Sequence, residues 1–263
     1  MAMTAALLIG CAAHVRPDPA PLVYGHAHND YAHDRPRAEA LECGFCSIEA
    51  DICLVNGKLL VAHDPKKTSP HRTLESLYLE PLRKRAAEHG GRVYRGGPTV
   101  TLLIDFKTPA AATYPVLRKL LLKYADLLTR YQDDKKYDGA LKIILTGSRP
   151  RPEMLAAENP RYVAIDGVLA DLDRDYPHDL MPQMNVQWTK VFQWKGDGPP
   201  PAEDRSRLRD LVARAHAKGR QIRFWDAPDQ PNAWRELLDA GVDWINTDNL
   251  RGLRVFFDGQ TSS

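Results

Sequence analysis

Residues 45–53 read Phe-Cys-Ser-Ile-Glu-Ala-Asp-Ile-Cys, and this run is the most decisive for the fold. Successive side chains of a β-strand point to opposite faces, so Glu49 and Asp51 share one face. The other face is apolar, as in a strand packed beneath helices, and carries Ile48, Ala50 and Ile52. Two neighbouring carboxylates repel each other and are costly to desolvate, so we expect a cation beside them. The alternative is an exposed edge strand with solvated acids, which the apolar flanks disfavour.

Similar short apolar runs recur along the chain, and helical stretches follow many of them. Strands are predicted at residues 22–26, 45–53, 100–107, 141–146, 162–166, 184–188, 221–225 and 243–246. Helices are predicted at residues 35–43, 73–89, 110–131, 205–218 and 232–240. Eight strands with interposed helices in about 240 residues are typical of a (β/α)8 TIM barrel. We therefore predict a single α/β domain over residues 21–258, with a doubly wound open sheet as the alternative. Residues 58–63 are expected to add a strand that forms a hairpin with the second one.

The charge of the chain is nearly balanced. Its 263 residues include 36 basic and 34 acidic ones, which gives a net charge of +2. Nucleic-acid binding usually needs a clustered basic face, so no nucleic-acid partner is expected. The sequence has no run of 18 apolar residues, so no membrane-spanning helix is predicted.

The first 20 residues differ in composition from the remainder. Leu8-Ile9-Gly10-Cys11 is similar to a bacterial lipoprotein processing box, in which the cysteine becomes acylated. Residues 17–21, Pro-Asp-Pro-Ala-Pro, have the composition of a linker. The positive segment that begins a signal peptide is missing, so an uncleaved, disordered N-terminus is the alternative. We expect residues 1–20 to be a leader and linker, with export to the periplasm or a lipid anchor to the cell envelope through Cys11.

Three further cysteines, Cys43, Cys46 and Cys53, follow the leader. The spacing of the first two suits half of a zinc site, but no second pair completes it. We interpret all three as buried thiols, because free cysteine is among the most buried residue types. A disulfide is the alternative.

Charged and aromatic side chains also end other predicted strands. Asp105 and Lys107 close the third strand, and Trp225 closes the seventh. Active sites of such barrels form at the carboxyl ends of the strands, so these residues should meet Glu49 and Asp51 at one mouth. Three carboxylates suit one Mg²⁺ or Ca²⁺ ion better than zinc, and Lys107 would face a phosphate oxygen. A plain ion pair between Asp105 and Lys107 is the alternative.

Two histidines, His26 and His63, each follow an apolar strand and bracket the acidic pair. A single histidine in such a place is more often structural, because histidine is only partly buried on average. Two of them beside carboxylates favour proton transfer, for which the pKa of histidine is suited. His28, which shares a face with His26, is a further candidate, as are His33 and His71.

These residues carry a resemblance to a known group of enzymes. Gly25-His26, Glu49-x-Asp51 followed by His63-Asp64, and Asp105-Phe106-Lys107 resemble the glycerophosphodiester phosphodiesterase-like group of the phosphatidylinositol phospholipase C-like superfamily. Residues 241–248, Gly-Val-Asp-Trp-Ile-Asn-Thr-Asp, resemble its last-strand motif. Residues 26–31, 72–78 and 223–225 further resemble the altered-inheritance-of-mitochondria branch. The resemblance implies a TIM barrel, a Ca²⁺ or Mg²⁺ site at Glu49, Asp51 and Asp105, and paired catalytic histidines at His26 and His63.

Some positions depart from the usual pattern of that group. Ala27 stands where an arginine usually follows the first histidine, and Asp105 stands where glutamate is usual. The lysine after Asp105 and the His26-x-x-Asn29 spacing are similar to the sphingomyelinase D branch, whose members expel the headgroup by internal attack of a hydroxyl. Trp225 matches an aromatic residue that lines the site there; a core tryptophan is equally consistent with the sequence.

The sequence therefore predicts a metal-dependent phosphodiesterase that acts on glycerophosphodiesters or lysophospholipid-like molecules. Lys107, Asn29 and Trp225 are expected to bind this small-molecule or lipid-headgroup substrate, and no protein partner is implied. Two alternatives stay open: a sphingomyelinase D-like lyase that forms a cyclic phosphate, and a non-catalytic module that binds a phosphorylated headgroup.

Overall fold

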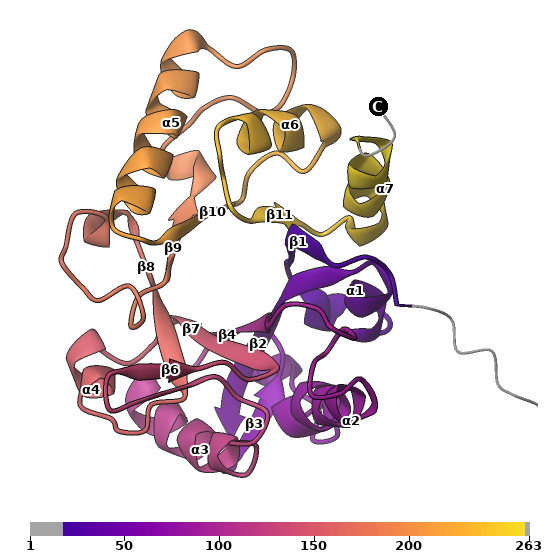
Figure 1. Ribbon diagram of the computed structural model, residues 1–263, viewed down its shortest axis with the longest axis vertical. Helices are drawn as coiled ribbons and strands as arrows, with labels where there is room; N and C mark the ends of the chain where they lie inside the picture. Colours follow the sequence, from indigo (N-terminus) through magenta and orange to yellow (C-terminus); the bar gives the residue numbers. More distant parts are fainter. Residues whose placement is uncertain (1–17, 261–263) are drawn as a thin grey trace, which may run out of the picture.

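The computed structural model describes residues 18–260, and its central feature is a ring of parallel strands (Figure 1). The ring consists of β1 (Leu22–Ala27), β2 (Phe45–Val55), β4 (Val100–Phe106), β7 (Leu141–Gly147), β8 (Val163–Gly167), β9 (Gln183–Gln187), β10 (Gln221–Trp225) and β11 (Ile245–Thr247). These strands pair in chain order from β1 to β10, and β11 pairs with β1. A parallel bridge between Arg223 and Trp244 nearly closes the ring. The predicted TIM barrel is confirmed, and the open sheet is not formed.

Two short hairpins extend from this ring. The strand β3 (Lys58–Val61) runs antiparallel to β2, as predicted. The strands β5 (Arg130–Gln132) and β6 (Lys135–Tyr137) form a second hairpin, which was not predicted. Its turn residues Asp133 and Asp134 have φ angles of 51° and 57°, and two consecutive positive φ angles are typical of tight hairpin turns.

The predicted helix over residues 110–131 is wrong beyond residue 122. The helix α3 (Ala110–Leu122) ends because the chain turns back to the amino-terminal end of β7. The backbone amide of Thr129 donates to the carbonyl of Leu141, and the amide of Leu141 donates to the carbonyl of Leu127. Leu127 and Leu128 are therefore buried at the amino-terminal end of the barrel. The helical spacing of these leucines does not distinguish this buried turn from a continued helix.

The other helices cover the outside of the ring (Figure 1). They are α1 (Ala38–Glu42), α2 (Glu80–Glu88), α4 (Pro152–Ala156), α5 (Ala202–Ala217), α6 (Pro231–Asp239) and α7 (Leu250–Gln260). The predicted helix over residues 73–89 is split, because a π-helical turn at Glu75–Leu79 precedes α2. Short 3₁₀ turns lie at Asp30–Ala32, Pro65–Lys67, Leu169–Asp171 and Trp188–Lys190. Within residues 18–260, no helix has the length and apolarity needed to cross a bilayer.

The connection from β8 to β9 contains a single 3₁₀ turn where a barrel usually has a helix. Arg220 replaces that helix as the support of the connection. Its buried guanidinium donates to four backbone carbonyls of the loop, at distances between 2.5 and 3.3 Å, and these belong to Asp171, Leu172, Arg174 and Tyr176. One buried arginine thus provides hydrogen-bond donors to a connection that has few backbone hydrogen bonds of its own.

Apolar side chains gather almost entirely between the strands and the helices. That outer layer forms one large cluster, whereas the ring encloses a cluster of only Leu103, Ile144 and Ala164. Adjacent strands place Glu49 opposite Leu103 and Leu103 opposite Ile144, so these residues form one layer inside the barrel. The layers above and below it are polar, and the candidate site lies in this interior.

The three cysteines within residues 18–260 are buried and free, so their interpretation as buried thiols is confirmed. Cys11 and most of the predicted leader lie outside the described residues.

Candidate active site

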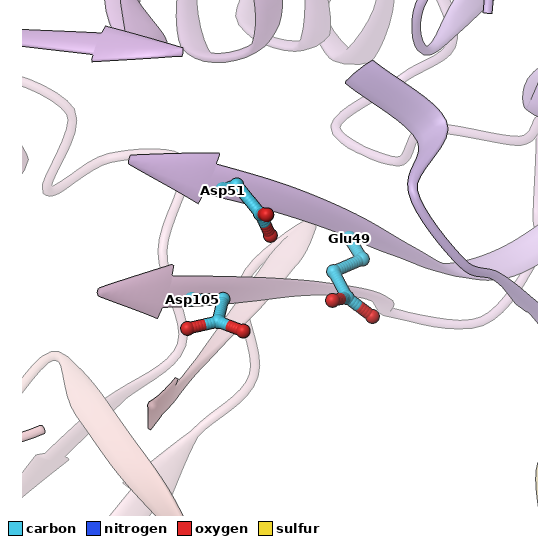
Figure 2. A group of neighbouring side chains, drawn as sticks. All are labelled: Glu49, Asp51 and Asp105. Atoms are coloured by element: carbon cyan, nitrogen blue, oxygen red, sulfur yellow. The ribbon is translucent and has the colours of Figure 1, made fainter. Parts of the chain in front are cut away.

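Three carboxylates from the neighbouring strands β2 and β4 meet inside the barrel. Figure 2 shows Glu49 and Asp51 on one strand and Asp105 on its neighbour, with their carboxyl groups turned into the same space. Asp51 and Asp105 are register partners, and one oxygen from each of the three residues lies within 4.8 Å of the other two. The predicted convergence of this acidic trio is confirmed.

The donor set of the trio fits a hard divalent cation. All three ligand groups are carboxylates, which suit Mg²⁺ or Ca²⁺. Asp51 is fully buried, and its Oδ1 has no hydrogen-bond partner among residues 18–260. An ionised oxygen without a partner is costly in a buried place, and a coordinated cation would remove that cost.

Two basic side chains already offset part of the negative charge of the trio. Lys107 Nζ lies 2.8 Å from Asp105 and 3.2 Å from Asp51, so the ion pair foreseen as the alternative is present. Arg223 donates to Glu49 over 2.8 Å. Burial would raise the pKa of Glu49, but Arg223 and the hydrogen bond to His26 hold it well below its usual range. Burial raises the pKa of Asp105, despite the opposing effect of Lys107.

The first predicted histidine, His26, lies inside the barrel and is fully buried. Its Nδ1 lies 2.7 Å from Ser47 Oγ, and its Nε2 lies 2.9 Å from Glu49 Oε2 and also contacts Arg223. Burial, assisted by the charge of Arg223, lowers the pKa of His26 to about 3. The imidazole is therefore neutral at physiological pH, and both of its nitrogens are occupied.

The second predicted histidine, His63, lies at the mouth instead. Its side chain is 70% exposed, and its Nδ1 lies 2.8 Å from Asp51 Oδ2. A carboxylate at Nδ1 orients the ring and leaves Nε2 for exchange with solvent or substrate. The two histidines thus contact two members of the trio, but His26 is buried and His63 is exposed.

A cavity of about 340 Å³ opens beside the trio. Its lining includes predicted site residues from five segments of the chain: Asn29, Glu49, His63, Asp105, Lys107 and Trp225. Trp225 is only partly buried and lines this cavity, and its role in substrate binding stays a prediction. Asn29 has a left-handed backbone, with φ 47°, and its amide accepts a hydrogen bond from Tyr31.

The opposite wall of the cavity holds a polar network that the sequence analysis missed. Arg223 Nε donates to Asn185, whose amide donates to the buried carboxylate of Asp166. Thr146 donates to the same carboxylate, and Arg149 Nε lies 2.9 Å from its second oxygen. Asp166 ends a predicted strand as Asp105 does, so the rule that found one acid could have found the other. Arg223 lies in the motif at residues 223–225, and a charged residue within an apolar strand is itself a signal of function.

The family model that matches this chain defines a class of phosphodiesterase domains. A solved phosphodiesterase from Oleispira antarctica, in complex with the product sn-glycerol-3-phosphate, shares the fold with a TM-score of 0.52 at 12% identity. The alignment covers 92% of this chain and 97% of that one. Residues 221–251 match the glycerophosphoryl diester phosphodiesterase family.

The chain belongs to the AIM6-like phosphodiesterase domain family, whose profile matches residues 15–166. An altered inheritance of mitochondria protein 6 homolog from Arthroderma benhamiae is 29% identical, over 88% of this chain and 83% of its own length. Altered inheritance of mitochondria protein 6 from Lachancea thermotolerans is 31% identical over 86% of this chain, which spans 63% of that relative. The resemblance to this branch is confirmed, whereas the likeness to sphingomyelinase D stays a prediction.

Proposed function

We propose that the protein hydrolyses phosphodiesters of small alcohols or lipid headgroups, with one Mg²⁺ or Ca²⁺ ion held by Glu49, Asp51 and Asp105. The observation that carries this proposal is the convergence of three carboxylates within 4.8 Å of one another at the cavity. A bound cation would offset the charge of the phosphate and polarise it for attack. Membership of the AIM6-like phosphodiesterase domain family supports the same reaction type.

Basic side chains around the cavity would receive the remaining phosphate oxygens. Lys107 and Arg223 already touch the trio, and Arg149 lines the same cavity. Arg223 and Arg149 also offer planar guanidinium groups, which match the geometry of a phosphate. Arg223 would place a guanidinium beside the substrate even though Ala27 supplies none.

His26 and His63 are proposed as the acid–base pair of the reaction. His63 is exposed and held by Asp51, so it can exchange protons with a substrate hydroxyl or water. His26 is neutral, because burial and Arg223 lower its pKa to about 3, and it reaches the trio through its contact with Glu49. Substitution of either residue by alanine should reduce kcat much more than it raises KM.

Glycerophosphodiesters and lysophospholipid-like molecules are the proposed substrates. Asn29 and Trp225 line the cavity and would contact the alcohol portion. Val168 also lines the cavity, and it and the adjacent Leu169 are 44% and 40% exposed. These two side chains give the mouth an apolar edge that suits a lipid chain, which is the specific observation in favour of the lysophospholipid-like candidate.

The test is ³¹P NMR of the products formed from a panel of glycerophosphodiesters and lysophospholipids, with Mg²⁺ or Ca²⁺ and with EDTA. The proposal expects a phosphomonoester that appears only with the ion. A cyclic phosphate would favour the lyase alternative. Headgroup binding without turnover, under all of these conditions, would favour the non-catalytic module and contradict the proposed hydrolysis.

Export and a lipid tether through Cys11 remain a separate proposal that rests on the sequence of the leader. Metabolic labelling with palmitate in a bacterial host, for the full chain and for Cys11→Ser, tests it directly. Label that depends on Cys11 is expected, and unlabelled soluble protein would contradict the tether.

A further inference from the structure

A buried carboxylate, Asp166, belongs to the cavity wall that lies opposite the trio. It stands near the carboxyl end of β8 and is 2% exposed. Thr146 donates to its Oδ2 over 2.5 Å, and Arg149 Nε lies 2.9 Å from its Oδ1. Arg149 Nε also donates to the backbone carbonyl of Asp166 over 3.0 Å. The carboxylate and the carbonyl of one residue therefore hold this guanidinium group together.

The same carboxylate reaches a second guanidinium group through an amide. Asn185 Nδ2 donates to Asp166 Oδ2 over 2.8 Å, and Arg223 Nε donates to Asn185 Oδ1 over 3.1 Å. An ionised carboxylate only accepts hydrogen bonds and a guanidinium group only donates them, so the amide can connect the two in this orientation alone. Gln183 donates to the same amide oxygen over 2.7 Å, which fixes Asn185 further.

Both arginines are held at Nε, which leaves terminal nitrogens for a ligand. Arg149 Nη2 lies 3.6 Å from Asp171, and Arg223 Nη1 donates to Glu49 over 2.8 Å. Arg149 Nη1 and Arg223 Nη2 have no hydrogen-bond partner among residues 18–260. Both residues line the cavity beside the trio. Oriented guanidinium groups with free N–H groups suit the oxygens of a phosphate.

A buried arginine with a structural role looks different in this chain. Arg161 is 5% exposed and does not line that cavity. Its Nη1 donates to the carbonyls of Val163 and Asp179, and its Nη2 pairs with the Asp179 carboxylate over 2.5 Å. Arg161 thus uses its terminal nitrogens within the protein, whereas the Asp166 network keeps those of Arg149 for the cavity.

Resting on the proposed function, we infer that Asp166 is a positioning residue that orients Arg149 directly, and Arg223 through Asn185, toward the phosphate of the diester. Asp166 itself touches no substrate atom. Its carboxylate keeps two donors in place at the cavity, so it acts on the affinity for the diester and not on the proton transfers. The network thus determines how tightly substrate is held, while the histidine pair determines how fast it reacts.

The division between KM and kcat provides the first test. For Asp166→Asn, we expect KM to rise about 10–100-fold on the diester that the wild type hydrolyses fastest, because charge-assisted hydrogen bonds to the phosphate lose their geometry. The change in kcat should stay below about threefold, as for a loss of uniform binding. KM does not depend on the fraction of folded enzyme, so partial misfolding cannot imitate this result.

A double-mutant cycle tests whether Asp166 acts through Arg149. The cycle compares Asp166→Asn, Arg149→Gln and the double variant. We expect the KM of the double variant to rise far less than the product of the two single increases, because both substitutions remove the same oriented donor. A purely structural Asp166 would give independent effects that multiply.

A variant outside the cavity serves as the matched control. Asp179→Asn also removes a carboxylate from a buried arginine, Arg161, but neither residue lines the cavity beside the trio. It should leave both KM and kcat unchanged. Asn185→Leu breaks only the connection to Arg223, so it should raise KM less than Asp166→Asn does, and it replaces that variant if Asp166→Asn does not fold.

Calorimetric titration with inorganic phosphate, in the presence of Mg²⁺, separates the inference from the proposed function. A wild type that turns over no diester overturns the proposed function, and the titration still tests the network. Weaker phosphate binding by Asp166→Asn or Asn185→Leu than by the wild type and Asp179→Asn supports it. Equal phosphate affinity in all of them, or an active Asp166→Asn with lowered kcat and unchanged KM, overturns the role of Asp166 while the proposed function stands.

Discussion

The two faces of β2 are equally buried but opposite in chemistry. Ile48 and Ile52 face the helices and are completely inaccessible, as are their apolar neighbours. Glu49 and Asp51 face the ring and are 4% and 0% exposed. The outer face stabilises the fold through apolar burial, whereas the buried charges of the inner face lower the stability of the fold. Substitutions on the two faces should therefore separate stability from activity.

The largest effect is expected on the inner face. Asp51→Asn should lower kcat on any diester substrate by about a thousandfold or more, because it removes a ligand charge from the proposed cation site. The melting temperature should stay the same or rise, since a buried carboxylate oxygen without a partner is lost.

The matched control for that substitution is Asp64→Asn. Asp64 follows His63 directly and accepts a hydrogen bond from the amide of Lys66, but it does not belong to the trio. It should retain activity near that of the wild type. Similar activity losses in both variants would contradict the special role of the inner face.

The next effect concerns the arginine that supports the helix-free connection. Arg220→Met should lower the free energy of unfolding by about 3–5 kcal/mol, because the carbonyls of Leu172, Arg174 and Tyr176 lose this donor at once. Chemical denaturation measures the loss, and hydrogen exchange should localise it to residues 168–182. Uniform exchange across the barrel, with normal stability, would show that the loop does not depend on Arg220.

A substitution on the outer face should lower stability and leave activity unchanged, the reverse of the effect expected for Asp51→Asn. Ile48→Ala should cost about 2–5 kcal/mol of stability, through lost burial and the cavity left behind. Activity per folded molecule should be unchanged at a temperature below the transition. Urea titration and active-site-normalised kcat provide the two measurements, and a selective loss of kcat would erase the distinction between the faces.

The smallest effect involves a buried acid away from the trio. Asp30 is fully buried and accepts hydrogen bonds from Tyr78 and the amide of Arg37, yet burial raises its pKa to about 6 from 3.8. The folded state therefore binds a proton that the unfolded state releases between these pH values. Stability from this group should fall as pH rises from 4 to 6, by at most about 1.4 kcal/mol per pH unit.

Asp30→Asn should remove that dependence, because an amide oxygen can still accept both hydrogen bonds. Unfolding free energies measured in urea between pH 4 and 7 give the comparison. A wild type and a variant with parallel pH profiles would show that Asp30 does not titrate in this range.

Much of the barrel could be predicted because strand periodicity and burial act locally. The apolar run at residues 45–53 and its two inward acids gave both a strand and a candidate site. The end of α3 could not be predicted, since leucines at helical spacing serve equally well in a turn that pairs with Leu141. The β5–β6 hairpin depends on two aspartates with positive φ angles, which tolerate that conformation better than most residues do.

The candidate site was predictable where residues lie at the ends of strands and less so where contacts cross the barrel. The trio follows from two neighbouring strands and the rule that their ends share one mouth. The pairing of Glu49 with Arg223, 174 residues later, depends on closure of the ring, so neither strand alone reveals the partner of its charged residue. For the same reason, the sequence placed His26 and His63 together but did not show that one is buried and the other exposed.

The most direct test of the account is a calorimetric titration of Mg²⁺ and of Ca²⁺ into the purified wild type and Asp105→Asn, with Asp64→Asn as control. The wild type and the control should bind one ion per chain, and Asp105→Asn should bind it far more weakly or not at all. No binding by the wild type, or equal affinity in all three proteins, would contradict the cation site at the mouth of the barrel.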